Sequence, residues 1–135
     1  MVRRWKAVSE ILIVDDSQVM RQMIMACLRA EPGLSFTQAA SGLEAIEKLS
    51  LGQFELVVLD LNMPDINGFE VIEFIRSQDT LRDLPILIVT TRGDETSRAR
   101  ALEIGASAFM SKPFSPEEIL AEVRVLLQGG RRAVS

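Results

Sequence analysis

Three short runs of mainly aliphatic residues, each followed by a polar residue, constrain the fold of this chain more than any other feature. The runs are Ile11–Val14, Phe54–Leu59 and Pro85–Val89, and the polar residues that follow them are Asp15, Asp60 and Thr90. Runs of this length are short for a helix and are typical of strands that are buried on both faces. The sequence therefore predicts three buried strands with polar residues at their carboxyl ends.

Segments with apolar residues at helical spacing separate these runs. The predicted helices cover residues 19–28, 42–51, 69–75, 94–104 and 116–127, and weaker strand patterns cover residues 34–39 and 108–110. Two helices have clear start signals, because Ser41 and Glu44 form a capping-box pattern and Ser115 precedes Pro116. Five strands that alternate with five helices through short connections indicate an α/β fold with a parallel sheet covered on both faces. The pattern alone does not define the strand order.

Length and charge limit the classes of protein that this chain can represent. We expect one domain at residues 10–128, between an N-terminal extension at 1–9 and a flexible C-terminal tail at 129–135. The net charge of −4 argues against nucleic acid as a partner. A single cysteine cannot form an internal disulfide, and no apolar stretch is long enough to span a membrane. We expect a soluble, cytoplasmic protein without a membrane partner.

Polar residues from several strand ends are predicted to meet at one edge of the sheet. Parallel strands place their carboxyl ends together, so Asp15, Asp16, Asp60, Thr90 and Lys112 should converge there. Three neighbouring carboxylates repel one another, and a divalent cation would relieve that repulsion. Oxygen ligands without histidine favour Mg²⁺, or Mn²⁺, over zinc. Lys112 and Thr90 suit phosphoryl oxygens, which leaves a carboxylate as the nucleophile, as in aspartyl-phosphate formation.

Four stretches of the sequence carry a resemblance to a known family. They are Val14–Ser17, Leu59–Gly68, Val89–Thr90 and Ser111–Phe114. In this order, each at the end of a predicted strand, they make residues 11–127 resemble the receiver domain of two-component response regulators, in particular its single-domain form. The resemblance implies a flavodoxin-like, doubly wound sheet of five parallel strands in the order 2-1-3-4-5 with five helices.

The resemblance also implies a phosphoacceptor and a metal site. Asp60 would accept a phosphoryl group from a histidine kinase or a phosphotransfer protein. Mg²⁺ would bind to the side chains of Asp16 and Asp60, to Asp15 through water, and to the backbone carbonyl of Asn62.

A conformational switch is a further implication of the resemblance. Thr90 and Lys112 would hold phosphoryl oxygens, and the Lys112–Pro113 peptide bond would be cis. Phosphorylation would draw Thr90 toward Asp60 and let Phe109 turn inward. This would alter the face formed by the fourth helix, the fifth strand and the fifth helix, where a target protein would bind. The residues alone leave Phe109 equally consistent with simple core packing.

Two residues follow the predicted switch threonine, and the first of them departs from the usual family pattern. Thr91 stands where the family usually has alanine or glycine, and its bulk would restrict access to Asp60. Arg92 would place a cation near the mouth of the pocket, within reach of the phosphoryl group or of Asn62. We hypothesise that Asn62, Thr91 and Arg92 modulate the rate of dephosphorylation.

The expected function is that of a stand-alone response regulator rather than an enzyme. We expect no DNA-binding or catalytic domain after Leu127, so the output would be phosphorylation-dependent protein binding by a monomer or weak dimer. The stretch Asn62–Pro64 modestly favours chemotaxis or motility. Two alternatives stay open. The first is a small Mg²⁺-dependent phosphohydrolase with an aspartyl nucleophile, against which Asn62 occupies the usual place of a second acid. The second is a degenerate receiver that binds its partner constitutively.

Overall fold

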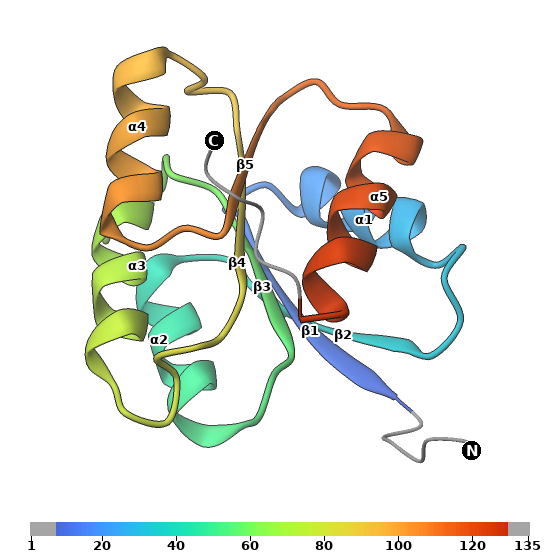
Figure 1. Cartoon of the computed structure of the whole chain (residues 1–135), viewed down its shortest axis with the longest axis horizontal. Coiled ribbons are helices and arrows are strands. Elements are labelled where there is room, and N and C mark those ends of the chain that lie inside the picture. The colour runs from blue at the N-terminus through green and yellow to red at the C-terminus, as the bar shows by residue number, and fades with distance from the viewer. Residues whose placement is uncertain (1–7, 130–135) are drawn as a thin grey trace.

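The apolar runs of the sequence form the centre of a five-stranded parallel sheet in the computed structural model, which describes residues 8–129 (Figure 1). The strands are β1 (Ser9–Val14), β2 (Leu34–Ala39), β3 (Leu56–Leu59), β4 (Ile86–Thr90) and β5 (Ala108–Ser111). They lie in the order β2-β1-β3-β4-β5, and every neighbouring pair is parallel. The predicted flavodoxin-like strand order is therefore confirmed. Every residue of β3 and β4 is buried, as expected for central strands of a covered sheet.

Five helices cover the two faces of the sheet (Figure 1). They are α1 (Gln18–Leu28), α2 (Gly42–Leu51), α3 (Gly68–Ser77), α4 (Glu95–Ile104) and α5 (Pro116–Leu127). Helices α1 and α5 pack together on one face, and α2, α3 and α4 lie side by side on the other. Because side chains alternate along a strand, β1 supplies Leu12 and Val14 to one core and Ile11 and Ile13 to the other.

A polar side chain caps the start of each helix, which fixes where the chain leaves each strand end. The caps are Ser17, Ser41, Asn67, Asp94 and Ser115, and each accepts a hydrogen bond from the backbone N–H three residues later. Complete capping boxes form at Asn67 and Ser115. The box predicted at Ser41 is only half formed, because the Glu44 carboxylate accepts from the N–H of Ala40 rather than from that of the cap.

The boundaries of several elements differ slightly from the predicted ones. β1 already begins at Ser9, inside the predicted extension, and β4 begins at Ile86 rather than at Pro85. Residues 1–7 and 130–135, which make up most of the predicted extension and tail, lie outside the described residues. Among the helices that the structure describes, none is long and apolar enough to cross a membrane.

Candidate functional site

Three aspartates meet at the carboxyl edge of the central strands. Asp15 and Asp16 follow β1, and Asp60 follows β3. These strands are paired neighbours, and the N–H of Asp60 donates to the carbonyl oxygen of Val14 at 3.1 Å. One carboxylate oxygen from each aspartate lies within 4.8 Å of the other two. Asp15 and Asp60 are buried, with exposed fractions of 2% and 6%, whereas Asp16 is exposed. We call these three residues the acidic cluster.

Lys112 joins the acidic cluster from the far side of β4. It follows β5, and its Nζ atom lies 2.7 Å from Asp15 Oδ2 and 3.3 Å from Asp60 Oδ2. Only 9% of the lysine side chain is exposed. One cation therefore faces three carboxylates, which leaves the group two negative charges in excess when all four residues are ionised. A site of this kind attracts a further cation, because buried like charges are costly without compensation.

Backbone hydrogen bonds hold the two buried carboxylates in fixed positions. Asp15 Oδ1 accepts from the N–H of Ser17 at 2.9 Å, and Asp60 Oδ1 accepts from the N–H of Asn62 at 3.2 Å. The guanidinium group of Arg21 donates to the backbone carbonyl of Asp15, which ties the turn after β1 to α1. These bonds leave the second oxygen of each buried carboxylate for Lys112.

Thr90 lies at the same edge, fully buried at the end of β4. Its Oγ1 atom accepts a hydrogen bond from the N–H of Arg92 at 3.1 Å, and its carbonyl accepts from the N–H of Lys112 at 2.8 Å. The hydroxyl proton therefore remains available for an acceptor in the site. Thr91 and Arg92 are both exposed.

The other residues singled out from the sequence also lie at or near this edge. Phe109 in β5 is half-buried and packs against the core beneath α2, α3 and α4. The Lys112–Pro113 peptide bond is cis, as predicted. Asn62 is exposed and stands two residues after the phosphoacceptor candidate Asp60.

A hollow of about 410 Å³ opens beside the acidic cluster. It is lined by Asp16, Leu61, Asn62, Met63, Pro64, Asn67 and Arg92. The hollow thus brings together one carboxylate of the cluster and two of the residues expected to modulate its chemistry. It provides an approach to the edge on which Asp60 lies.

Asp65 and Gly68 contribute to the site in ways that the sequence pattern did not reveal. The Asp65 carboxylate accepts hydrogen bonds from the N–H groups of Gly42 and Leu43, so the β3–α3 loop caps α2. The N–H of Leu43 lowers the pKa of Asp65 from its usual range. A Cβ atom at Gly68 would lie 2.6 Å from the carbonyl oxygen of Asp60, so only glycine lets α3 start this close to the cluster. The only signal for either residue was a run of turn-forming residue types.

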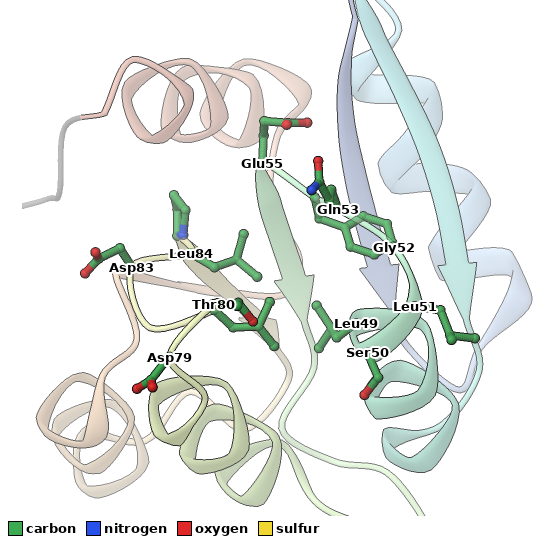
Figure 2. A pocket seen from close by; sticks show the side chains of 13 residues that line it. Leu49, Ser50, Leu51, Gly52, Gln53, Glu55, Asp79, Thr80, Asp83 and Leu84 are labelled. Carbon is green, nitrogen blue, oxygen red and sulfur yellow. The ribbon is translucent and has the colours of Figure 1, made fainter.

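A larger hollow of about 620 Å³ lies at the opposite edge of the sheet, between the end of α2 and the α3–β4 connection (Figure 2). Two of its acidic residues are engaged in the structure. Glu55 accepts a hydrogen bond from the N–H of Glu10 at 2.6 Å, and Asp79 pairs with Arg82. None of the residues of the acidic cluster lines it, so we place the chemistry of the protein at the other edge.

The donor set of the acidic cluster fits a hard divalent cation. All of its side-chain ligands are carboxylate oxygens, the chain contains no histidine, and its one cysteine, Cys27, lies on α1. Mg²⁺ and Mn²⁺ prefer such oxygen ligands, whereas zinc favours nitrogen and sulfur. Fold and site together define a flavodoxin-like α/β domain with an acidic cluster at its carboxyl edge whose oxygens suit a hard divalent cation.

Comparisons with known proteins give the family. The sequence model of one protein family, the response regulator receiver domain, matches residues 11–124. The chain is 36% identical over 118 residues to the transcriptional regulatory protein GltR of Pseudomonas aeruginosa, covering 87% of this chain and 48% of GltR. It is 39% identical over 118 residues to the response regulator MprA of a Mycobacterium species, covering 87% of this chain and 50% of MprA.

Solved structures agree with this result. The chemotaxis response regulator CheY4 of Vibrio cholerae superposes with a TM-score of 0.81 at 33% identity, covering 88% of this chain and 98% of that chain. The chain belongs to the response regulator receiver domain family of two-component systems. It spans about half the length of the curated relatives that it matches.

Proposed function

We propose that this receiver domain works as a phosphorylation switch with Asp60 as its phosphoacceptor. The observation that carries the proposal is the position of Lys112, which bridges the buried carboxylates of Asp15 and Asp60. A cation held against the nucleophile is suited to stabilise the charge that develops on a phosphoryl group during transfer. Asn62 stands two residues after Asp60, so the site has no second acid at the position that a phosphohydrolase would use.

In the proposed reaction, a carboxylate oxygen of Asp60 attacks the phosphorus atom of a phosphohistidine. The new O–P bond forms as the P–N bond breaks, and its electron pair returns to the imidazole nitrogen. The chain has no histidine, so the donor is a histidine kinase or a phosphotransfer protein. Side chains of Asp16 and Asp60, Asp15 through water, and the carbonyl of Asn62 would hold Mg²⁺, or Mn²⁺. The bound ion would supply positive charge that offsets the charge of the phosphoryl oxygens.

The switch would then act through Thr90 and Phe109. The Thr90 hydroxyl already accepts from the N–H of Arg92, so its proton is free to bond a phosphoryl oxygen. Movement of Thr90 toward Asp60 would open space for the half-buried Phe109, which lies in β5 between the helices of the output face. We take this face, formed by α4, β5 and α5, as the docking site for a target protein.

We further propose that the domain acts in the cytoplasm through protein binding, as a monomer or weak dimer, rather than through nucleic acid. Its acidic net charge of −4 supports this, since phosphate contacts need a basic surface. GltR is a transcriptional regulatory protein, so a DNA-binding output belongs to that relative, whereas CheY4 is a chemotaxis regulator. An affinity pull-down of partner proteins by this chain, with and without beryllofluoride as a phosphoryl mimic, would distinguish a conditional from a constitutive output. Equal capture in both states would favour a degenerate receiver.

The switch and the phosphohydrolase make different predictions for turnover. With Mg²⁺ and a panel of phosphomonoesters, we expect no sustained release of inorganic phosphate above that of the Asp60→Asn variant. Multiple turnovers that depend on Asp60 would contradict the switch and establish the enzyme.

Exposed residues at the site entrance are proposed to set the lifetime of the phosphorylated state. Asn62 and Arg92 line the hollow beside the cluster, and Thr91 directly precedes Arg92 in the chain. Thr91→Ala should admit water more easily and shorten the lifetime, and Arg92→Glu should change it by replacing a cation with an anion. If neither substitution alters the decay of the aspartyl phosphate, these residues have no such role.

A further inference from the structure

Two arginines contact the ring of one buried phenylalanine, and one of them borders the hollow beside the acidic cluster. Phe69 lies in the first turn of α3, and 1% of it is exposed. The guanidinium carbon of Arg100, on α4, lies 4.0 Å from the centre of the Phe69 ring. That of Arg92, in the β4–α4 loop, lies 5.4 Å from the same point. Helices α3 and α4 are neighbours on one face of the sheet, which brings the Phe69 ring on α3 within reach of both arginines (Figure 1).

The Phe69 ring is a partner that both guanidinium groups share. Both distances are within the range in which a cation is attracted to an aromatic face. Among residues 8–129, neither Arg92 nor Arg100 forms an ion pair, whereas Arg98 on the same helix lies 3.9 Å from Glu95. Two like charges on one ring also repel each other, so each weakens the hold of the ring on the other.

Arg92 is the arginine of this pair that borders the phosphorylation site. It lines the hollow of about 410 Å³ together with Asp16 and Asn62. Its N–H group holds the hydroxyl oxygen of Thr90 at 3.1 Å. Its guanidinium group can therefore lie either on the ring or in the hollow, where a phosphoryl group on Asp60 would attract it.

We propose that the Phe69 ring holds Arg92 away from the phosphoryl group, and that Arg100 is a positioning residue that weakens this hold by occupying the same ring. The proposal rests on the proposed function, because it needs an anion at Asp60. Removal of the Phe69 ring would release the Arg92 guanidinium group toward the anion and tighten anion binding. Removal of the Arg100 guanidinium group would strengthen the contact of Arg92 with the ring and weaken anion binding.

The two substitutions are therefore expected to act in opposite directions. An exposed cation–π contact corresponds to about a two- to fivefold change in an equilibrium constant. We expect Phe69→Leu to lower the dissociation constant for beryllofluoride with Mg²⁺ by about that factor, and Arg100→Met to raise it by a similar factor. Both effects should vanish when Arg92 is replaced by methionine, because the ring and Arg100 act only through Arg92.

The experiment is a calorimetric titration of the full chain with beryllofluoride in saturating Mg²⁺. Arg98→Met is the matched control, since Arg98 lies on α4 but pairs with Glu95, and it should leave the dissociation constant unchanged. Circular dichroism checks that Phe69→Leu is folded, and Arg100→Met tests the proposal without a change in the core. Equal dissociation constants for wild type and Arg100→Met, or effects that persist in the Arg92→Met background, would overturn the inference. If the wild-type chain binds no beryllofluoride at all, the proposed function fails and this inference fails with it.

Discussion

Replacement of Asp60 by asparagine should stabilise the protein in the absence of divalent cations. Asp60 is buried and shares the single ammonium group of Lys112 with Asp15. Asparagine has the same shape, and its side-chain oxygen can keep the hydrogen bond from the N–H of Asn62. The substitution therefore removes mainly a charge.

The expected gain follows from the charges around Asp60. At an effective dielectric constant of about 20, a carboxylate within 4.8 Å repels Asp60 by about 3.5 kcal/mol. Lys112, at 3.3 Å, attracts it by about 5 kcal/mol. Asp16 is exposed, so solvent reduces its repulsion of Asp60 to about half of that value. Repulsion and attraction then nearly cancel, so the cost of desolvating the carboxylate decides the sign of the change in stability. We expect Asp60→Asn to raise the free energy of unfolding by about 1 kcal/mol.

The assay is urea unfolding followed by far-UV circular dichroism, with a chelator and again with saturating MgCl₂. Asp60→Asn should have the higher free energy of unfolding in the chelator, and wild type should gain more from Mg²⁺ because it keeps all its ligands. The control is Asp83→Asn on the exposed α3–β4 connection, which should stay within about 0.5 kcal/mol of wild type in both conditions. The reasoning is refuted if Asp60→Asn is less stable than wild type in the chelator by 1 kcal/mol or more.

Three other substitutions test the environment of the cluster. Lys112→Met leaves buried carboxylates without their cation and should lower the free energy of unfolding in chelator by about 3 kcal/mol; unchanged stability in urea would contradict the ion pairs. Gly68→Ala forces a Cβ atom against backbone and should cost about 2 kcal/mol. At Gly52 the nearest atom to a new Cβ is a side-chain atom at 3.3 Å, so Gly52→Ala should cost less, and equal losses would argue against the close approach. Hydrogen bonds, first that from Leu43, lower the pKa of Asp65, so its contribution is present above the usual aspartate pKa of about 3.9 and is lost as the pH falls through the lower folded value. The Asp65→Asn variant should therefore lose less stability than wild type on acidification. Equal losses of the two proteins in thermal melts would contradict a role of the Asp65 carboxylate in capping α2.

The sequence predicted the acidic cluster because the rule that it used depends only on strand ends. Each buried run ended in a polar residue, and a parallel sheet brings such residues together without knowledge of any single contact. The same rule placed Lys112 near Asp60, although β4 lies between their strands. β2 was harder to predict because it is an edge strand with half-buried residues, and α4 because it buries little more than Ser97 and Ala101.

Contacts between side chains of distant elements could not be predicted in this way. Asp65 resembled an ordinary turn former, and nothing in its neighbourhood showed that it would cap a helix that begins at Gly42. Phe69 was predicted only as a core residue of an amphipathic helix. The contacts of its ring with Arg92 and Arg100 depend on how α3 packs beside α4, which the periodicity of a single helix does not specify.

Phosphorylation of the isolated chain by a small phosphodonor tests the central claim most directly. Acetyl phosphate with Mg²⁺ should add one acid-labile phosphoryl group, which peptide mapping should assign to Asp60. The Asp60→Asn variant should stay folded by circular dichroism and gain no phosphoryl group. Modification of another residue, or equal modification of the folded Asp60→Asn variant, would contradict the assignment of Asp60 as the phosphoacceptor.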